Sequence, residues 1–314
     1  MPYDVELEEY HEDILLSEGP KNCLVTGGAG FIGSNIVNKL IEDGHYVRVV
    51  DDLSSGSQYN FKYQTEFYRA DISEEPFLDM FQDVDIVFHL AAFPRVEPSI
   101  QDPIKAHRIN VNGTLNVLNA CVKHGVKRLV FTSSSAVYGE AKVPTTEEHS
   151  KNPMSPYALN KLIGEQYCKL YSDLYGLQTV CLRYSNVYGE GQPTEGAYCN
   201  VMGIFENQKL LGNPMTIVGD GEQRRDFIHV QDIVEANKIV AFTKDISFLG
   251  EVYNVGYGKN YSVNDIAKWI GGETINIEPR VEPKETLLNS DKFKKAFEWK
   301  TTVDLKKWLE EKNV

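Results

Sequence analysis

The stretch CLVTGGAGFIGSNIVNKL, residues 23–40, reads as a strand, a tight glycine turn and an amphipathic helix. Gly27, Gly30 and Gly33 follow one another at intervals of three residues. In dinucleotide-binding turns the first glycine permits the turn and the second lets the backbone approach a pyrophosphate, while the third lets the helix pack closely on the strand. The helix N-terminus would then face the phosphates. This stretch therefore predicts the start of a dinucleotide-binding fold.

An acid follows the glycine turn at the expected distance. The next predicted strand, YVRVVD at 46–51, ends on Asp51, about twenty residues after the glycines, where such folds place an acid against the adenosine ribose. A carboxylate there accepts hydrogen bonds from the ribose hydroxyls and repels a 2′-phosphate, so NAD is favoured over NADP. The alternative is that Asp51 is a solvated strand end.

Strand-length apolar runs alternate with helical stretches up to residue 188. Further strands are predicted at 66–70, 85–90, 127–133 and 179–185, and helices at 31–42 and 103–123 and after Pro156. The segment VYNVG at 252–256 could return to the sheet. Strands separated by helices are typical of a parallel sheet covered on both faces. The predicted fold class is α/β, a Rossmann-type doubly wound parallel sheet with a smaller C-terminal substrate lobe.

The alternation ends after Tyr188, and this break sets the domain division. Residues 1–20 are an N-terminal extension that could carry a short amphipathic helix at 5–16. Residues 21–188 are the predicted NAD-binding Rossmann domain, with return segments near 224–258. Residues 189–314 are mainly the substrate-binding lobe.

Composition disfavours several classes of partner. A net charge of −13 disfavours nucleic acid, and no apolar run is long enough to span a membrane. Five scattered cysteines without a CxxC pair are typical of buried thiols in a reducing compartment. The seven histidines lack metal-ligand spacing. We expect a cytoplasmic protein without a bound metal and without a nucleic-acid or membrane partner.

The segment SPYALNKLIGEQY, residues 155–167, places Tyr157 and Lys161 four apart on one face of a predicted helix. Alone, such a pair can be an exposed face without function. Lowering a tyrosine pKa from ~10 to about 7 takes on the order of 4 kcal/mol. One ammonium about 4 Å away supplies ~4 kcal/mol at an effective dielectric constant of ~20. Lys161 is therefore sufficient in principle to activate Tyr157.

Taken together, ordered motifs along the chain give a family resemblance that starts at about Lys21. They are TGGAGFIGSN at 26–35, DDLSSG at 51–56, ADI at 70–72, HLAA at 89–92, NVNGTLNVL at 110–118, SSSAVYG at 133–139, YALNK at 157–161, RYSNVYG at 183–189 and RRDFIHVQD at 224–232. The sequence resembles the extended short-chain dehydrogenase/reductase family, specifically its nucleotide-sugar epimerase branch. Within this branch it is most similar to UDP-glucose and UDP-N-acetylglucosamine 4-epimerases.

The resemblance implies a catalytic trio. Tyr157 would be the base that removes the sugar C4 hydroxyl proton as hydride leaves. Lys161 would lower the tyrosine pKa and bind the nicotinamide ribose. Ser134 would shuttle a proton or orient the C4 oxygen, and its alternative is an ordinary turn serine. Ser135 and Ala136 stand where related dehydratases carry an acidic pair, so that chemistry lacks its acids.

The resemblance also implies a set of NAD contacts. Asp51 and Asp71 would bind the adenosine half, with Ile72 against the adenine or simply in the core. Phe31 and Ile32 would supply backbone donors to the pyrophosphate. The remaining implied cofactor residues are Leu90, Ala91, Ala92 and Asn110. The last of these could bind through water or be a helix-capping or core asparagine.

For a UDP-sugar substrate, the resemblance implies a diphosphate contact at Arg225, with Arg224 as a solvated neighbour, and a substrate contact at Asn186. Arg280 would be a second phosphate arginine, although its spacing to Glu282 is one residue shorter than usual. Further departures are Ser185, where the family often has Phe, and Asn289, where it usually has Asp. Arg95 could touch substrate or be solvated.

Thr286 is the expected specificity position. It lies three residues before Asn289, where the branch places a residue that gates the pocket near the sugar C2 group. A large aromatic there is associated with plain hexoses and a small residue also with N-acetyl sugars. Thr286 therefore predicts room for an acetamido group, and the alternative is a surface strand residue.

The resulting functional expectation is an NAD-dependent nucleotide-sugar 4-epimerase that acts by transient oxidation at C4. The alternatives are a nucleotide-sugar dehydrogenase or reductase, and a non-catalytic NAD-binding regulator. The resemblance further implies a homodimer through the helix near 103–123 and the Tyr157 helix. Ile163, Leu170 and Leu174 could face the partner or pack on the sheet.

Overall fold

The computed structural model describes residues 18–74, 79–94, 96–196, 199–279 and 282–312. The helix predicted at 5–16, Arg95 and Arg280 lie outside the described residues.

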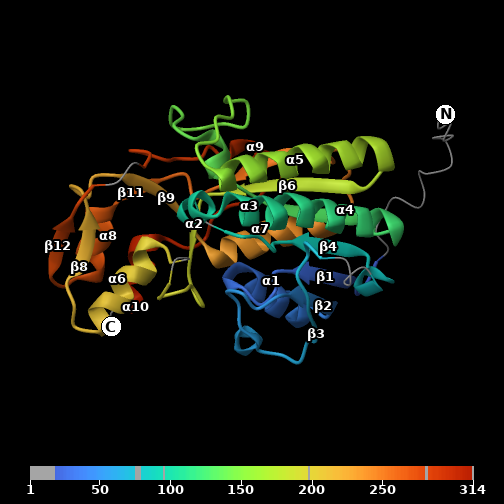
Figure 1. Ribbon diagram of the computed structural model, residues 1–314, viewed down its shortest axis with the longest axis horizontal. Coiled ribbons are helices and arrows are strands. Elements are labelled where there is room, and N and C mark those ends of the chain that lie inside the picture. Colours follow the sequence, from blue (N-terminus) through green and yellow to red (C-terminus); the bar gives the residue numbers. More distant parts are fainter. Residues whose placement is uncertain (1–17, 75–78, 95, 197–198, 280–281, 313–314) are drawn as a thin grey trace.

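Seven parallel strands form the central sheet, in the order β10–β6–β5–β4–β1–β2–β3 (Figure 1). They are β1 (Asn22–Thr26), β2 (Tyr46–Asp51), β3 (Glu66–Arg69), β4 (Ile86–His89), β5 (Arg128–Ser134), β6 (Gln178–Tyr184) and β10 (Val252–Val255). The strand order reverses between β1 and β4, and ligands bind at such a switch point in open α/β sheets. The predicted fold class is confirmed, and the segment expected to return to the sheet does so as β10.

Helices cover both faces of this sheet. On one face α1 (Phe31–Glu42) and α7 (Val230–Phe242) bury apolar side chains such as Ile36, Leu40 and Val234. On the other face α4 (Gly113–Lys123) and α5 (Pro156–Tyr175) bury Val117 and Cys168 among others. The two buried faces explain why the sheet strands read as continuous apolar runs.

The loop after β4 leads into a helical stretch with one irregularity. It contains α2 (Val96–Gln101), α3 (Pro103–His107) and a π-helical turn, η3 (Arg108–Asn112), which runs directly into α4. The single helix predicted at 103–123 is therefore interrupted by η3. The other short turns are η1 (Gln58–Asn60) and η4 (Ser135–Tyr138).

Helix α5 carries the Tyr157–Lys161 pair and has clear end signals. The Ser155 hydroxyl accepts a hydrogen bond from the Ala158 amide at 3.2 Å, and Pro156 occupies the first turn. Gly176, with φ of +67°, ends the helix in the left-handed conformation that favours glycine. Ser155 and Pro156 thus fix the start of the helix next to Tyr157, and Gly176 fixes its end.

A smaller lobe carries its own sheets and core, at the left of Figure 1. Its strands are β7 (Asn186–Tyr188), β9 (Arg224–His229) and β11 (Asn260–Ser262) in one sheet, and β8 (Met215–Val218) and β12 (Thr274–Ile277) in another. Helices α6 (Val201–Leu210), α8 (Val263–Ile270) and α10 (Leu305–Lys312) pack around a core that includes Phe205, Phe227 and Ile266. In contrast, α9 (Asp291–Phe297) packs on β10 of the large sheet. No described helix is both long and apolar enough to cross a bilayer.

Candidate active site

The glycine turn between β1 and α1 forms a cradle with little room for side chains. Gly27 has φ of +69°, and a Cβ there would lie 2.6 Å from the Ala91 nitrogen. A Cβ on Gly33 would collide with the Gly27 carbonyl oxygen. A Cβ on Gly30 would meet only that oxygen, at 3.3 Å, among the described atoms. The turn is therefore closed toward the protein at Gly27 and Gly33 and open at Gly30, as a phosphate cradle requires.

Gly30 is the N-cap residue of helix α1, and within the described chain this end has no side-chain hydrogen bond that caps it. The first amides of a helix have no partner inside the helix, so those of Phe31 and Ile32 are available to an anion. This arrangement fits the pyrophosphate of a dinucleotide.

Asp51 lies beside this cradle at the end of β2. Its carboxylate is 7% exposed and accepts hydrogen bonds from the Ala29 amide at 3.0 Å and the Leu53 amide at 2.8 Å. Burial raises its pKa, and the two backbone hydrogen bonds oppose that shift. The remaining lone pairs suit ribose hydroxyls, so the residues present fit NAD.

Asp71 and Ile72 follow β3 at the same sheet edge. The Asp71 carboxylate accepts hydrogen bonds from the Ser73 amide and hydroxyl at 2.8 and 2.7 Å, and Arg108 lies 3.5 Å away. The Ile72 side chain is buried in the core below α4, where a Cβ on Gly113 would lie 2.7 Å from it. The core alternative thus describes the Ile72 side chain, whereas Asp71 stays at the edge.

Asn110 in η3 fastens the loop that follows β4. Its side-chain oxygen accepts from the Phe93 amide at 2.6 Å, and its amide donates to the Phe93 carbonyl at 3.0 Å. The residue is 3% exposed, which matches the core-polar alternative. Just before Phe93, Leu90, Ala91 and Ala92 are half-buried, and the Leu90 amide donates to the Thr26 carbonyl of β1 at 3.0 Å. These residues therefore lie next to the glycine turn.

The predicted catalytic residues come from two elements that meet at the carboxyl end of β5. Ser134 ends β5, and its hydroxyl accepts from the Ala136 amide at 3.2 Å. Lys161 of α5 donates to the Thr132 carbonyl at 2.6 Å, two residues before Ser134. The Lys161 ammonium lies 6.0 Å from the centroid of the Tyr157 ring. The Tyr157 amide in turn donates to the buried Ser99 hydroxyl of α2 at 3.0 Å.

Lys161 is 4% exposed, and burial lowers its pKa to about 8, although Cys168 and Glu165 oppose that shift. An ammonium in a poorly solvated site favours the ionised form of a neighbouring phenol. The arrangement can therefore support proton removal by Tyr157.

A buried polar network below these residues was missed from the sequence. Glu165 accepts two hydrogen bonds from Arg183, at 2.8 and 2.6 Å, and one from the Ser133 hydroxyl. Arg183 also donates to the Tyr138 hydroxyl at 2.6 Å. The available signal was spacing, because Glu165 follows Lys161 by four residues and so continues the face that Tyr157 begins.

The predicted substrate residues lie on β7 and β9 of the smaller lobe. Arg225 pairs with Glu282 at 2.7 Å, and both side chains are largely buried. Asn186 donates to the Asp226 carbonyl at 3.1 Å. Arg224 is turned to Asn260, at 3.1 Å, and its side chain is 40% exposed. The two neighbouring arginines therefore have different surroundings.

Thr286 lies alongside β9, since its amide donates to the Arg224 carbonyl at 3.0 Å. It is half-buried, and its hydroxyl oxygen is buried without a hydrogen-bond partner among the described residues. Leu288, two residues on and hence on the same side of this extended segment, packs on Val137 and Tyr138 in the turn after Ser134. Thr286 is therefore not a surface strand residue.

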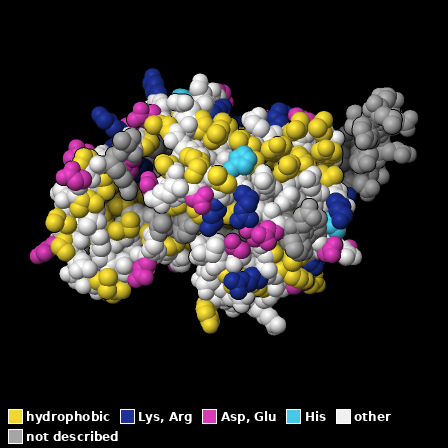
Figure 2. All heavy atoms as spheres, viewed as in Figure 1, with side chains coloured by type: hydrophobic (Ala, Val, Ile, Leu, Met, Phe, Trp, Pro, Cys, Tyr) yellow, Lys and Arg dark blue, Asp and Glu magenta, His cyan; other side chains and the backbone are white. Residues whose placement is uncertain are grey.

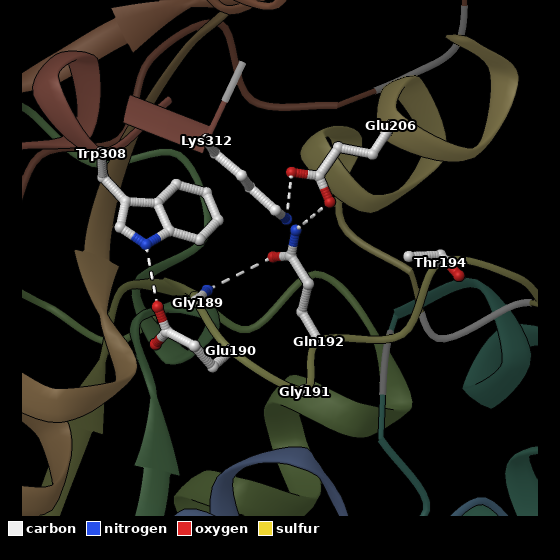
Figure 3. Close-up of a pocket in the computed structure, with 8 residues that line it drawn as sticks. All are labelled: Gly189, Glu190, Gly191, Gln192, Thr194, Glu206, Trp308 and Lys312. Carbon is white, nitrogen blue, oxygen red and sulfur yellow. Dashed lines mark hydrogen bonds and ion pairs between the residues drawn. The ribbon is translucent and has the colours of Figure 1, made fainter. Parts of the chain in front are cut away.

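A cavity of about 310 Å³ lies where the loop 189–194 meets α6 and α10 (Figure 3). Glu190 accepts from the Trp308 indole at 3.0 Å, and Glu206 pairs with Lys312 at 2.7 Å. The Glu190 carbonyl accepts from the Asn35 amide of α1 at 3.1 Å. No predicted site residue lines this cavity, and its charged side chains Glu190, Glu206 and Lys312 all have partners among the described residues.

The chain is similar to known proteins in sequence and in structure. The model of the NAD dependent epimerase/dehydratase family matches residues 23–256. A Methanocaldococcus jannaschii protein provisionally named UDP-glucose 4-epimerase is 42% identical over 296 residues, covering 91% of this chain and 95% of its own length.

Two solved structures are similar over nearly the whole chain. One is a UDP-N-acetylglucosamine 4-epimerase from Methanobrevibacter ruminantium in complex with UDP-N-acetylmuramic acid, with a TM-score of 0.88, 34% identity and coverage of 94% of this chain and 97% of that one. The other is a UDP-glucose 4-epimerase from Thermus thermophilus in complex with NAD, with a TM-score of 0.85, 34% identity and coverage of 92% and 96%.

Proposed function

This chain belongs to the NAD dependent epimerase/dehydratase family, and from that membership we propose that it is an NAD-dependent nucleotide-sugar 4-epimerase, an isomerase. The observation that carries the proposal is the meeting of Ser134, Tyr157 and Lys161 at the end of β5, beside the glycine cradle.

We propose the following roles for the catalytic residues. Bound NAD would supply the hydride-transfer chemistry for a reversible oxidation at the sugar C4, with the hydride returned to the opposite face of the ring. Tyr157 takes the C4 hydroxyl proton and later gives it back. Lys161 holds a positive charge beside the phenol and so favours its ionised form. Ser134 orients the C4 oxygen with its hydroxyl.

The cofactor would be held by residues of the large sheet. The backbone at Gly27, Gly30, Phe31, Ile32 and Gly33 would bind the pyrophosphate. Asp51 would accept the ribose hydroxyls. The other proposed contacts are Asp71, Ile72 through its backbone, Leu90, Ala91, Ala92 and Asn110. In domain terms, residues 21–188 with the returns near 224–258 would bind NAD, and 189–314 mainly the substrate.

The proposed substrate is a UDP-sugar. Arg225, with its planar fork, would bind the diphosphate in place of its contact with Glu282, and Asn186 and Arg280 would assist. Thr286 would line the pocket at the sugar C2 group, where its unpartnered hydroxyl could bind an acetamido group. The similar enzyme from Methanobrevibacter ruminantium acts on an N-acetylated sugar nucleotide, which supports this extension.

The test is incubation with a panel of UDP- and GDP-sugars, followed by detection of the C4 epimer. A 4-epimerase regenerates NAD in each turnover, so we expect a new epimer without a rise in NADH absorbance. Steady accumulation of NADH without an epimer would instead identify a dehydrogenase. An NAD complex with no turnover of any sugar would identify a binding protein.

We also propose a homodimer. Hydrophobic side chains gather over α3, α4 and α5 in Figure 2. On α5, Leu170 is 45% and Leu174 is 64% exposed, so these two face outward rather than onto the sheet. Light scattering at micromolar concentration should give twice the chain mass of 35.5 kDa, and Leu174→Glu should lower it. A monomeric wild type would contradict this.

A cytoplasmic location is proposed as well. All five cysteines are free thiols, which fits a reducing compartment.

A further inference from the structure

One face of α5 carries Tyr157, Lys161 and Glu165 at steps of four residues. Lys161 is 4% and Glu165 is 1% exposed, so this face is buried from the second residue onward. The proposed mechanism uses the first two residues and leaves a buried carboxylate directly behind them.

Glu165 joins α5 to two strands of the large sheet. Its two oxygens receive the fork of Arg183 on β6, at 2.8 and 2.6 Å, and one of them also accepts the Ser133 hydroxyl of β5. Such a bidentate pair fixes orientation as well as distance. The Arg183–Glu165 pair therefore fixes where α5 lies along β5 and β6.

The contacts of α5 with the end of β5 fall on consecutive strand residues. Lys161 binds the Thr132 carbonyl, Glu165 binds the Ser133 hydroxyl, and Ser134 is the next residue. Beyond Ser134, the η4 turn ends at Tyr138, whose hydroxyl accepts from Arg183 at 2.6 Å and donates to Asn254 at 2.8 Å. The same buried pair therefore supports the strand before Ser134 and the turn after it.

Glu165 also sets the charge that Lys161 faces. Lys161 faces five titratable side chains: Tyr157, Glu165 and Cys168 on its own helix, Cys181 on β6 and His89 on β4. His89 is neutral because burial lowers its pKa to about 3. The Cys181 thiol is neutral because burial raises its pKa. Cys168, Glu165 and Cys181 oppose the effect of burial on the Lys161 pKa, in that order, and Glu165 is the carboxylate among them.

We propose that Glu165 is a positioning residue for the epimerase reaction, whose carboxylate holds the end of β5 against α5 and supplies the negative charge that keeps Lys161 an ammonium. This inference rests on the proposed roles of Tyr157 and Lys161. It goes beyond them because Glu165 has no proposed contact with the substrate or with NAD. It acts only through Lys161, Ser133 and Arg183.

The test uses double variants that remove both partners of the Arg183–Glu165 ion pair together. Breaking one side of a buried ion pair is strongly destabilising, whereas replacing both partners is often tolerated. We therefore choose Glu165→Gln with Arg183→Gln, and Glu165→Leu with Arg183→Met. The matched control is Arg128→Met, because Arg128 is also fully buried, begins the same strand β5 and binds Gln178 and the carbonyls at the end of α7.

Two readouts separate positioning from simple stability. The first is the titration of Lys161 in the cofactor-free protein, followed by NMR of ¹³C-labelled lysine and assigned with Lys161→Met. The second is the pH profile of kcat. We expect Lys161 to titrate near pH 8 in the wild type. In the two double variants, which replace the ion pair by a neutral pair, the pH at which Lys161 titrates and the basic limb of the kcat profile should both move about one pH unit lower. Arg128→Met should lower the melting temperature and leave both of these unchanged.

Ser133→Ala gives an answer even if the neutral pairs do not fold. It removes one hydrogen bond to Glu165 and keeps the charge, so kcat should fall several-fold with the basic limb unchanged. Folded neutral pairs with a wild-type lysine titration overturn the inference, and so does Ser133→Ala with wild-type kcat. Full activity in Tyr157→Phe would instead overturn the proposed function, so the two failures are distinguishable.

Discussion

The two lobes hold the proposed site residues by different means. In the large sheet, the proposed contacts with NAD come from backbone and buried groups, such as the cradle at Gly27 and Gly33 and the carboxylate of Asp51. In the smaller lobe, the proposed contacts with the substrate come from side chains on the three-residue strand β7 and the six-residue strand β9. An example is Arg225, which pairs with Glu282. A backbone cradle tolerates little change, whereas a side-chain contact can be exchanged without rebuilding the fold.

This difference assigns the fixed and the variable parts of the chemistry. Every substrate of such an enzyme would meet the same cofactor and the same tyrosine, which the large sheet holds. The sugar and its substituents would meet residues of the smaller lobe. Substitutions in the large sheet should therefore affect turnover or folding, and those in the smaller lobe should affect which sugar is accepted.

The largest effect is expected in the part held by the large sheet, at Tyr157. Tyr157→Phe keeps the ring and removes the ionisable oxygen, so kcat should fall by about 10³-fold or more while NAD affinity and melting temperature stay near wild type. Tyr175→Phe, at the exposed end of the same helix, is the matched control. Turnover near the wild-type value would remove Tyr157 from the mechanism.

Two substitutions in the glycine cradle should have different effects, one on folding and the other on NAD binding. In Gly33→Ala the new methyl group would collide with the Gly27 carbonyl and lie 2.8 Å from the Gly28 Cα, so unfolding should become easier by about 3 kcal/mol or more. In Gly30→Ala the new methyl group would meet only the Gly27 carbonyl oxygen, at 3.3 Å, among the described atoms, so this variant should fold with little loss of stability but bind NAD weakly. Denaturant unfolding and calorimetry with NAD measure the two effects. Equal stabilities of the two variants would show that the cradle is not rigid.

The buried ammonium of Lys161 should lower the stability of the folded protein. Its folded pKa of about 8 lies below the ordinary lysine pKa of 10.5, so below pH 8 the folded state carries the cost of a buried ammonium. As pH rises from 8 to 10.5, the folded protein releases that proton before the unfolded chain does, and stability rises by up to about 3 kcal/mol relative to a variant without this group.

Lys161→Met provides that variant. It should be inactive, and the difference in unfolding free energy between it and the wild type should shrink between pH 8 and 10.5. A difference that does not change with pH in this window would mean that the buried amine does not titrate there.

The large sheet was readable from the sequence because its signals are local. Glycine spacing, the acid after β2 and the Tyr157–Lys161 interval each lie within one element or at its end. The partners of Arg225 and Asn110 were not readable, because Glu282 and Phe93 reach them from distant or irregular segments. Glu165 was overlooked although its spacing was visible, since its partners Ser133 and Arg183 lie on other strands.

In the smaller lobe, Arg225 and Arg224 form a natural pair for comparison. Arg225→Met should raise the KM for a UDP-sugar about 30-fold, the equivalent of about 2 kcal/mol for a charged hydrogen-bonding contact, with NAD affinity unchanged. Arg224→Met, whose arginine is turned to Asn260, should change KM by about threefold or less. Initial-rate kinetics decide between them, and equal effects of the two variants would count against a diphosphate contact at Arg225.

The smallest effect, and the sharpest test of the contrast, concerns Thr286. Two substitutions separate the size of this side chain from its unpartnered hydroxyl. Thr286→Tyr fills the space near C2, and overpacking costs roughly 1 to 3 kcal/mol, so kcat/KM for UDP-N-acetylgalactosamine relative to UDP-galactose should fall about tenfold or more. Thr286→Val keeps the volume and removes the hydroxyl, so the same ratio should fall only about fivefold, the value of one hydrogen bond. Both variants should leave NAD affinity unchanged, because the proposed cofactor contacts lie on the other lobe. A wild type that rejects the acetylated sugar, or a tyrosine variant that keeps the wild-type ratio, would show that Thr286 does not line the sugar pocket.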